Sequence, residues 1–589
     1  MDRTAWIAIT LCVLGLVAWE IWIARQPLPP PAVATASSPV PPLARRAPAA
    51  SAPTAAATPV PPAGTAATPG PSAPPAQFEE KTETLRNSDV ELHLTNRGGG
   101  ISEAVLLNYP AEVGKSERVT LNSPARTPIG AIVDDPAAPV LPEYKIARKA
   151  DTVALEYVTP EQVTIRKKFF FPPTNEKKDN FVAKLDVDFT NNGAAPYANP
   201  GYFLGIGSAA RIHRNDYPSY TRLVWLVGGH TKGIDVGWFA GGSGFFGMGQ
   251  HPPRPYYTQS VNAAEWVAAS NQFFTTLAVP LTGKADAVWG KRFEIDPAEK
   301  NYGLEGAMHL PGFRVEAGQT YNAHFQLYLG PKLYHRLAQL EHNEAEVMEF
   351  GIFKIICQAL LNALNTFHSF LGNYAAAILA LTTIVKLSLW PLQTKATASM
   401  RRMSALSPKI QELREKYKDD PTRMNQETMK LYKEYGINPV GGCLPMLIQI
   451  PIFFGLFTML RQAVELRGAH FLWIKDLSQP DTVFIIKGLG WIPILGTPGL
   501  GLTINILPLI MAATSFWMTH LTPKSGDPTQ QRMMMFMPVI FIVFCYNFAA
   551  ALALYYTVQN LFSILQLYQN RKQPVPTLEK VAGPKRKRR

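Results

Sequence analysis

The chain has 589 residues and a formal net charge of +13, with 57 Lys and Arg against 44 Asp and Glu. Its four cysteines, Cys12, Cys357, Cys443 and Cys545, all lie in or beside apolar runs, which excludes a disulfide framework. No metal-ligand spacing is present, and we expect neither a metal nor a cofactor. The mean hydropathy near zero averages over strongly apolar and strongly polar regions, which predicts a membrane protein with a large aqueous domain.

The first 77 residues divide into an apolar segment and a low-complexity tether. An apolar run follows Arg3, and we predict that residues 1–24 form a transmembrane signal anchor. Cleavage is disfavoured because Trp19 and Trp22 stand where signal peptidase requires small side chains. Residues 25–77 are largely Pro, Ala, Thr and Ser, and this composition predicts a disordered tether, because it offers too little bulky apolar surface to offset the entropy of ordering.

Polar and apolar residues alternate in the region 78–349, as they do in strands with one buried face. The alternation is clearest in residues 89–95, 153–158, 182–189 and 321–329. The region is therefore predicted to be an all-β sandwich. The segment Gly242–Gly247 formally matches a dinucleotide-binding fingerprint, but it lacks the strand-then-helix context, so we interpret it as a glycine-rich loop.

The pattern becomes helical after residue 349. Residues 350–371 mix apolar and polar side chains, which predicts an amphipathic helix lying in the membrane interface. Residues 373–392 are apolar enough to span the membrane. The charged segment 393–438 follows, and it is predicted to be a helical hairpin in water, with helix starts at Ser407-Pro408 and Asp420-Pro421.

Four more spans are predicted in the last third of the chain, at about 440–460, 505–521, 533–548 and 549–568. The stretch 483–503 is apolar but is interrupted by Lys487, Gly and Pro, so we place it at the interface rather than across the membrane. Together with the anchor, the prediction is an α-helical polytopic membrane bundle of six spans carrying an all-β domain.

The distribution of Lys and Arg predicts the orientation of this bundle. The hairpin 393–438 and the tail 571–589 are rich in both residues, so both are expected in the cytoplasm. Six spans then put the N-terminus in the cytoplasm and the β-rich domain outside. The basic tail is interpreted as a topology signal, while ribosome binding and nucleic-acid binding are the two alternatives.

Lys386 lies within the predicted span 373–392, where a lysine costs about 2.5–3.5 kcal/mol at the bilayer centre. Two interpretations remain open: the amine faces a polar cavity, or it snorkels to the headgroups near Leu392. Thr382 and Thr383 share its helix face, and Gln449 lies in the next span. A polar flank on the last span comprises Tyr555, Tyr556, Gln559, Asn560 and Ser563. These residues predict a hydrophilic groove, with ordinary interhelical hydrogen bonding as the alternative.

Many short motifs in this order resemble one protein family. They include Thr382-Thr-Ile-Val-Lys386, Asn438-Pro-Val-Gly-Gly-Cys443, Gln449-Ile-Pro-Ile-Phe453 and Leu554-Tyr-Tyr-Thr-Val-Gln-Asn560, and in the β-rich region Gly330-Pro-Lys332. Through these motifs the chain resembles the YidC/Oxa/Alb membrane insertases, in the bacterial form that has a large periplasmic domain.

The resemblance implies a non-enzymatic insertase and chaperone of the bacterial inner membrane, acting on nascent membrane proteins alone or with the Sec translocon and its accessory subunits. It also implies that five core helices enclose a substrate groove containing Lys386, where relatives commonly have Arg. The hairpin is expected to contact substrate or ribosome through Arg401, Arg402, Lys409, Arg414 and Lys416. The basic tail is a further candidate for ribosome contact.

Two other functions are alternatives to the insertase. An anion-selective transporter or channel would use Lys386 for selectivity, but the spans show none of the internal duplication common in transporters. A membrane-anchored enzyme acting on carbohydrate would use the β-rich domain, which the resemblance likens to sugar mutarotases. No catalytic motif supports an enzyme, and likeness of fold alone confers no activity.

Overall fold

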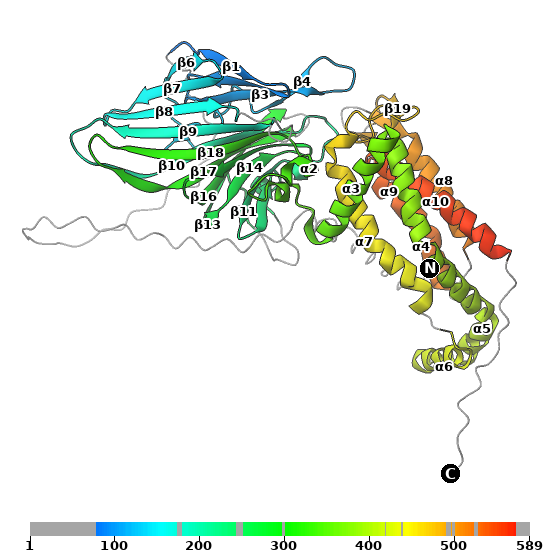
Figure 1. The fold of residues 1–589 in the computed structure, drawn as a ribbon. Helices are drawn as coiled ribbons and strands as arrows, with labels where there is room; N and C mark the ends of the chain where they lie inside the picture. The colour runs from blue at the N-terminus through cyan, green and yellow to red at the C-terminus, as the bar shows by residue number, and fades with distance from the viewer. Residues whose placement is uncertain are drawn as a thin grey trace, which may run out of the picture.

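The computed structural model describes residues 78–172, 180–242, 251–296, 301–418, 420–437, 440–489, 496–497, 501–522 and 528–572. A sheet-rich domain packs beside one end of a helical bundle (Figure 1). The predicted anchor 1–24, the tether 25–77, the tail beyond residue 572 and most of Gly242–Gly247 lie outside the described residues.

Three antiparallel sheets build the sheet-rich domain. The largest runs in the order β12 (His230–Asp235), β11 (Arg222–Val227), β14 (Trp266–Ser270), β15 (Phe274–Pro280), β18 (Thr320–Pro331), β9 (Val182–Asn191), β8 (Val163–Phe170), β7 (Thr152–Val158) and β6 (Lys145–Lys149). The second has the order β13 (Tyr256–Ala264), β16 (Ala285–Asp296), β17 (Asn301–Val315), β10 (Tyr197–Ala209) and β5 (Ile132–Val133). The third has the order β1 (Thr82–Arg86), β2 (Val90–Thr95), β3 (Gly100–Pro110) and β4 (Arg118–Leu121).

Alternation along the strands creates the core of this domain. In β9, Leu185, Val187 and Phe189 are fully buried, with polar residues between them that are partly exposed. Strands β10 and β17 of the second sheet pack against β14 and β15 of the largest sheet. Trp225 and Trp266 are fully buried in the resulting core. The predicted strands at 89–95, 153–158, 182–189 and 321–329 correspond to β2, β7, β9 and β18.

Lys167 of β8 is fully buried inside the sheet domain. Its Nζ donates hydrogen bonds to the carbonyl oxygens of Gly98 (3.0 Å), Gly99 (2.9 Å) and Gly130 (2.9 Å). All three glycines have positive φ, a conformation that costs glycine little and directs their carbonyls at the amine. Burial lowers the pKa of Lys167 well below its usual value. Lys167 is therefore the single hydrogen-bond donor shared by these three loop carbonyls.

The helical part begins with a short helix and continues as a bundle. Its helices are α2 (Tyr334–Leu337), α3 (Lys354–Leu371), α4 (Tyr374–Ala405), α5 (Ser407–Lys416), α6 (Pro421–Glu434), α7 (Val440–Gln462), α8 (Ile506–Leu521), α9 (Pro528–Cys545) and α10 (Ala550–Arg571). Among the described residues, α4 alone is both long and apolar enough to cross a membrane by these two criteria, and Ile506–Leu521 and Met535–Cys545 are shorter apolar helices.

Local sequence explains most helix boundaries. Gly372, at φ +66°, ends α3, and the Asn373 side chain caps α4 by accepting hydrogen bonds from the backbone of Ala375 and Ala376. Asp420 caps α6 in the same way. The predicted start of the polar hairpin at residue 393 differs from the structure, because α4 continues through Pro391 to Ala405. The separate hairpin consists of α5 and α6, at the two predicted helix starts.

The sequence predicts that the insert 483–503 lies at the membrane interface, and we assign it no role from sequence. Its described residues belong to a small antiparallel sheet of β19 (Thr482–Ile486), β21 (Gly501–Asn505) and β20 (Gly496–Thr497). In Figure 1, β19 lies at the end of the bundle where the sheet domain attaches, whereas α5 and α6 lie at the opposite end.

Arg461, in the last turn of α7, joins the sheet domain to the bundle. Its guanidinium lies 4.2 Å from the ring centroid of Tyr217 in the sheet domain, and 3.8 Å and 4.5 Å from those of Phe457 and Phe548 in the bundle. Its backbone carbonyl accepts a hydrogen bond from Gln272 Nε2 (2.8 Å). Cation–π contacts of this kind strengthen when they are desolvated. The Arg461 side chain therefore holds the sheet domain against the bundle.

We predict that Lys167→Met lowers the free energy of unfolding by about 3 kcal/mol, because three buried carbonyls lose their donor. Denaturant unfolding of the purified protein, followed by tryptophan fluorescence, measures the change. The matched control is Lys168→Met, since Lys168 is a partly exposed neighbour whose contact is a surface ion pair with Asp188 (3.7 Å). Equal stability of the two variants would contradict the assigned role of Lys167.

Candidate functional site

Lys386 of α4 is 4 % exposed and its amine points across the bundle to α10. Nζ donates a hydrogen bond to Ser563 Oγ (2.7 Å), and that hydroxyl donates to the carbonyl of Gln559 (3.0 Å). Lys386 lies twelve residues after Tyr374 and Ser563 thirteen after Ala550, so both are about 18–20 Å of helix from the outer ends of α4 and α10. The amine is thus directed to a neighbouring helix rather than toward Leu392.

The charge of Lys386 has no acidic partner in the bundle helices. The sequences of α4, α7, α8, α9 and α10 contain no Asp or Glu. Within the described parts of the chain, no salt bridge to Lys386 is formed. Neutral polar groups therefore provide the whole stabilisation of this amine, and an acidic group arriving from outside would be attracted to it.

Polar side chains from three helices meet at Lys386. Thr382 of α4, Gln449 of α7, and Tyr555 and Gln559 of α10 line one small cavity with it, together with Gln393 and three apolar side chains. The cavity volume of about 10 Å³ is the lower limit for one water molecule. The helices therefore pack closely here.

Three of the predicted groove residues lie away from this cavity. The Tyr556 ring packs against Phe453 and Phe541, at centroid distances of 5.3 Å and 5.1 Å. Asn560 Nδ2 donates to α8, with Ser515 Oγ at 2.8 Å. Thr383 Oγ1 donates to the carbonyl of Leu379 in its own helix (2.8 Å).

Helical spacing explains this division. Tyr555, Gln559 and Ser563 are four residues apart and share one face of α10, whereas Tyr556 and Asn560 are each one residue further along and are turned by about 100°. Gln566, which the sequence reasoning missed, extends the first face: its Nε2 donates to the Trp390 carbonyl (3.1 Å) and to Thr394 Oγ1 (3.0 Å) of α4. Gln566 lies three residues after Ser563, so helical spacing along this face predicts its position from the sequence.

The basic residues predicted to contact substrate or ribosome have different surroundings. Arg401 is partly buried, and its Nη1 donates to the Asn570 carbonyl (2.7 Å), which ties α4 to the end of α10. Lys409 contacts the Tyr435 hydroxyl and lies 4.6 Å from its ring centroid. Arg402 and Lys416 are exposed, and Arg414 is half-buried. Among these five residues, the exposed Arg402, Lys409 and Lys416 lie on α4 and α5.

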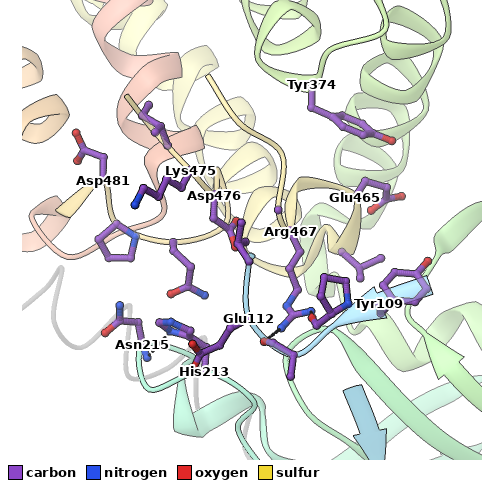
Figure 2. A pocket seen from close by; sticks show the side chains of 18 of the residues that line it. Tyr109, Glu112, His213, Asn215, Tyr374, Glu465, Arg467, Lys475, Asp476 and Asp481 are labelled. Carbon is purple, nitrogen blue, oxygen red and sulfur yellow. Dashed lines mark hydrogen bonds between the residues drawn. The ribbon is translucent and has the colours of Figure 1, made fainter. Parts of the chain in front are cut away.

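A larger cavity, of about 660 Å³, lies between the sheet domain and the segment that follows α7. Figure 2 shows Glu112, His213 and Asn215 on one side, and Arg467, Lys475 and Asp476 on the other. Arg467 donates to the carbonyls of Pro110 (2.6 Å) and Ala111 (2.5 Å).

Other charged groups around this cavity also have structural partners. Gln479 Nε2 donates to Asp216 Oδ1 (3.1 Å), and burial raises the pKa of Asp216. Asp481 Oδ2 accepts from the Leu507 backbone (2.6 Å), which caps α8. We assign this cavity to the joint between the domain and the bundle, and the chemistry of the site to Lys386.

Fold and site together define a membrane protein with a sheet-rich domain outside the bundle and a polar cluster around a lysine within it. Residues 83–363 match the family described as YidC periplasmic domain, and residues 366–576 match the family described as 60Kd inner membrane protein. The chain belongs to the YidC family of membrane protein insertases, which are not enzymes. The family resemblance in the sequence motifs is therefore confirmed.

Individual relatives match to different extents, and each bears the name membrane protein insertase YidC. The relative from Syntrophus aciditrophicus is 29% identical over 97% of this chain and 100% of its own length. That from Paraburkholderia phymatum is 31% identical over 71% of this chain and 69% of its own length. That from Syntrophobacter fumaroxidans is 41% identical over 51% of this chain, and this match spans 53% of that relative.

One solved structure aligned with this chain is an active YidC insertase with its first transmembrane domain resolved. It covers 84% of this chain and 94% of its own, at 19% identity and a TM-score of 0.34.

We predict that Asn560→Ala destabilises the solubilised protein by about 1 kcal/mol, because α10 loses its side-chain hydrogen bonds to α8. Thermal unfolding in detergent measures the loss. Leu561→Ala is the control, since Leu561 is an exposed neighbour on the same helix. If both variants unfold at the wild-type temperature, Asn560 does not hold these helices together.

Proposed function

We propose that this protein inserts membrane proteins into the bacterial inner membrane and assists their folding, alone or with the Sec translocon and its accessory subunits. The observation that carries the proposal is Lys386, a cation inside a bundle of helices without acidic residues, surrounded by neutral polar side chains from α4, α7 and α10. Membership of the insertase family supports the same function.

The proposal places the chain across the membrane in six spans, with both termini in the cytoplasm. Its parts are the anchor 1–24, the tether 25–77, the periplasmic domain 78–349, an interfacial helix at 350–371, the insertase core 372–570 and the tail 571–589. The placement of the basic helices α5 and α6 at the end of the bundle remote from the sheet domain supports this orientation (Figure 1).

In the proposed mechanism, the exposed cations of the α4–α6 region first receive the nascent chain. The helices around Lys386 then part, and the lysine with Thr382, Gln449 and the Tyr555–Ser563 face attracts a polar or acidic segment into the bilayer. The apolar part of the substrate moves into lipid, driven by burial of about 25 cal/mol per Å². The protein itself only lowers the barrier for the polar segment.

Two contacts with other machinery belong to the same proposal. The basic tail beyond residue 572 and the exposed Arg402 and Lys416 are candidates for contact with the ribosome. We expect no recognition of a nucleic-acid sequence, because phosphate attraction alone carries no sequence information.

The alternative, an anion-selective transporter, rests on Lys386 alone. A transporter needs a continuous polar route, and the cavity at Lys386 holds about 10 Å³ between closely packed helices. Membership of the insertase family favours the insertase over the transporter. The transporter remains the alternative that a defect in solute flux would support.

We predict that Lys386→Glu slows insertion of substrates with acidic translocated segments about tenfold, since attraction is replaced by repulsion and each 1.36 kcal/mol of barrier is a factor of ten. Insertion into vesicles reconstituted with the purified protein measures the rate. Lys386→Arg should retain insertion because it keeps the charge. The same assay with a substrate lacking acidic residues is the matched control, and an equal effect on both substrates would contradict the role of the charge.

A further inference from the structure

Strand β19 presents an unbroken apolar surface at the outer end of the bundle. Its residues Val483, Phe484, Ile485 and Ile486 are 53 %, 63 %, 36 % and 37 % exposed. Successive side chains of a strand point to opposite faces, so Phe484 and Ile486 cover one face and Ile485 the other. A strand that is apolar on both faces is not suited to water, where such runs associate with other surfaces.

The small sheet is fixed rigidly to the ends of the membrane helices. Thr482 Oγ1 donates to Asn505 Oδ1 (2.7 Å), and Asn505 Nδ2 donates to the Tyr546 carbonyl (2.8 Å) in the link between α9 and α10. The Tyr546 hydroxyl donates back to the Thr503 carbonyl (2.8 Å). Helix α8 begins directly after β21, so β19 has a fixed position relative to α8.

Exposed apolar side chains also lie in the chain before and after the small sheet. On α8, Leu509 and Ile510 are exposed in the turn that follows the sheet. On the other side, Trp473 and Val483 line the same cavity, and Trp473 is exposed while its Nε1 donates to Asp481 Oδ2 (3.2 Å). Tryptophan favours the boundary between headgroups and hydrocarbon. Exposed apolar side chains therefore accompany β19 in both segments that flank the small sheet along the chain.

We propose that β19 docks into the outer leaflet of the bilayer, at the level between headgroups and hydrocarbon. Among the described residues, β19 pairs with β21 alone. Its other edge limits the depth, because unpaired backbone groups are not tolerated in hydrocarbon. The exposed Lys487 at the end of the strand matches a headgroup position. The occupant of the apolar surface is therefore phospholipid, and docking holds the outer ends of α8 and α10 at a fixed depth.

Photo-crosslinking tests this proposal directly. The full chain, with p-benzoylphenylalanine in place of Phe484, is reconstituted into vesicles of phosphatidylethanolamine and phosphatidylglycerol and irradiated. Adducts are identified by mass spectrometry. The control carries the same group in place of Val158, which is 49 % exposed at the end of β7, a strand remote from the bundle (Figure 1). An unchanged thermal midpoint checks that each variant is folded.

The expected result is at least about tenfold more phospholipid adduct at position 484 than at position 158. Equal and low yields at the two positions would overturn the proposal. Adducts at position 484 with a second copy of the chain, in place of lipid, would overturn it as well and would make β19 a contact between copies.

Discussion

A positive charge held inside an apolar bundle without a carboxylate is the constraint on which the membrane part of this protein depends. Lys386 can remain there only because Ser563 Oγ accepts a hydrogen bond from its amine and because neighbouring polar groups replace water. That requirement explains why α10 presents polar side chains to α4 at four-residue spacing, and why Gln566 continues the same contact. In the proposed mechanism, the missing counter-ion comes from the substrate.

A second requirement is that this bundle be held firmly at its outer end. The contacts of Arg461 with Tyr217, Phe457 and Phe548, and those of Arg467 with the β3–β4 turn, connect the sheet domain to the segment after α7. The opposite end, with α5 and α6, lacks such a domain in the described residues (Figure 1). Opening of the bundle for a substrate is therefore easier from the cytoplasmic side, in the proposed orientation.

Sequence predicted the strands and most helix boundaries, because alternation and caps are local signals. The position of Lys386 in an apolar helix is equally visible in the sequence, while its role in a groove stays a prediction. The predicted groove residues Thr383, Tyr556 and Asn560 do not line the cavity at Lys386, because Tyr556 and Asn560 lie on another face of α10 and the Thr383 hydroxyl donates within its own helix. Sequence reasoning also missed the joint at Arg461 and the sheet containing β19. The joint at Arg461 depends on contacts between residues far apart in the chain, which no local pattern encodes. In the stretch around β19, Gly and Pro residues obscure the strand pattern.

Depletion of this protein in its own host is the most direct measurement of the central claim. Small one- and two-span membrane proteins are labelled during synthesis, and their accessibility to protease added outside the inner membrane is followed. The account predicts that their insertion is lost while secreted proteins are largely unaffected. Normal insertion, accompanied by a defect in solute flux, would contradict the insertase and support the transporter.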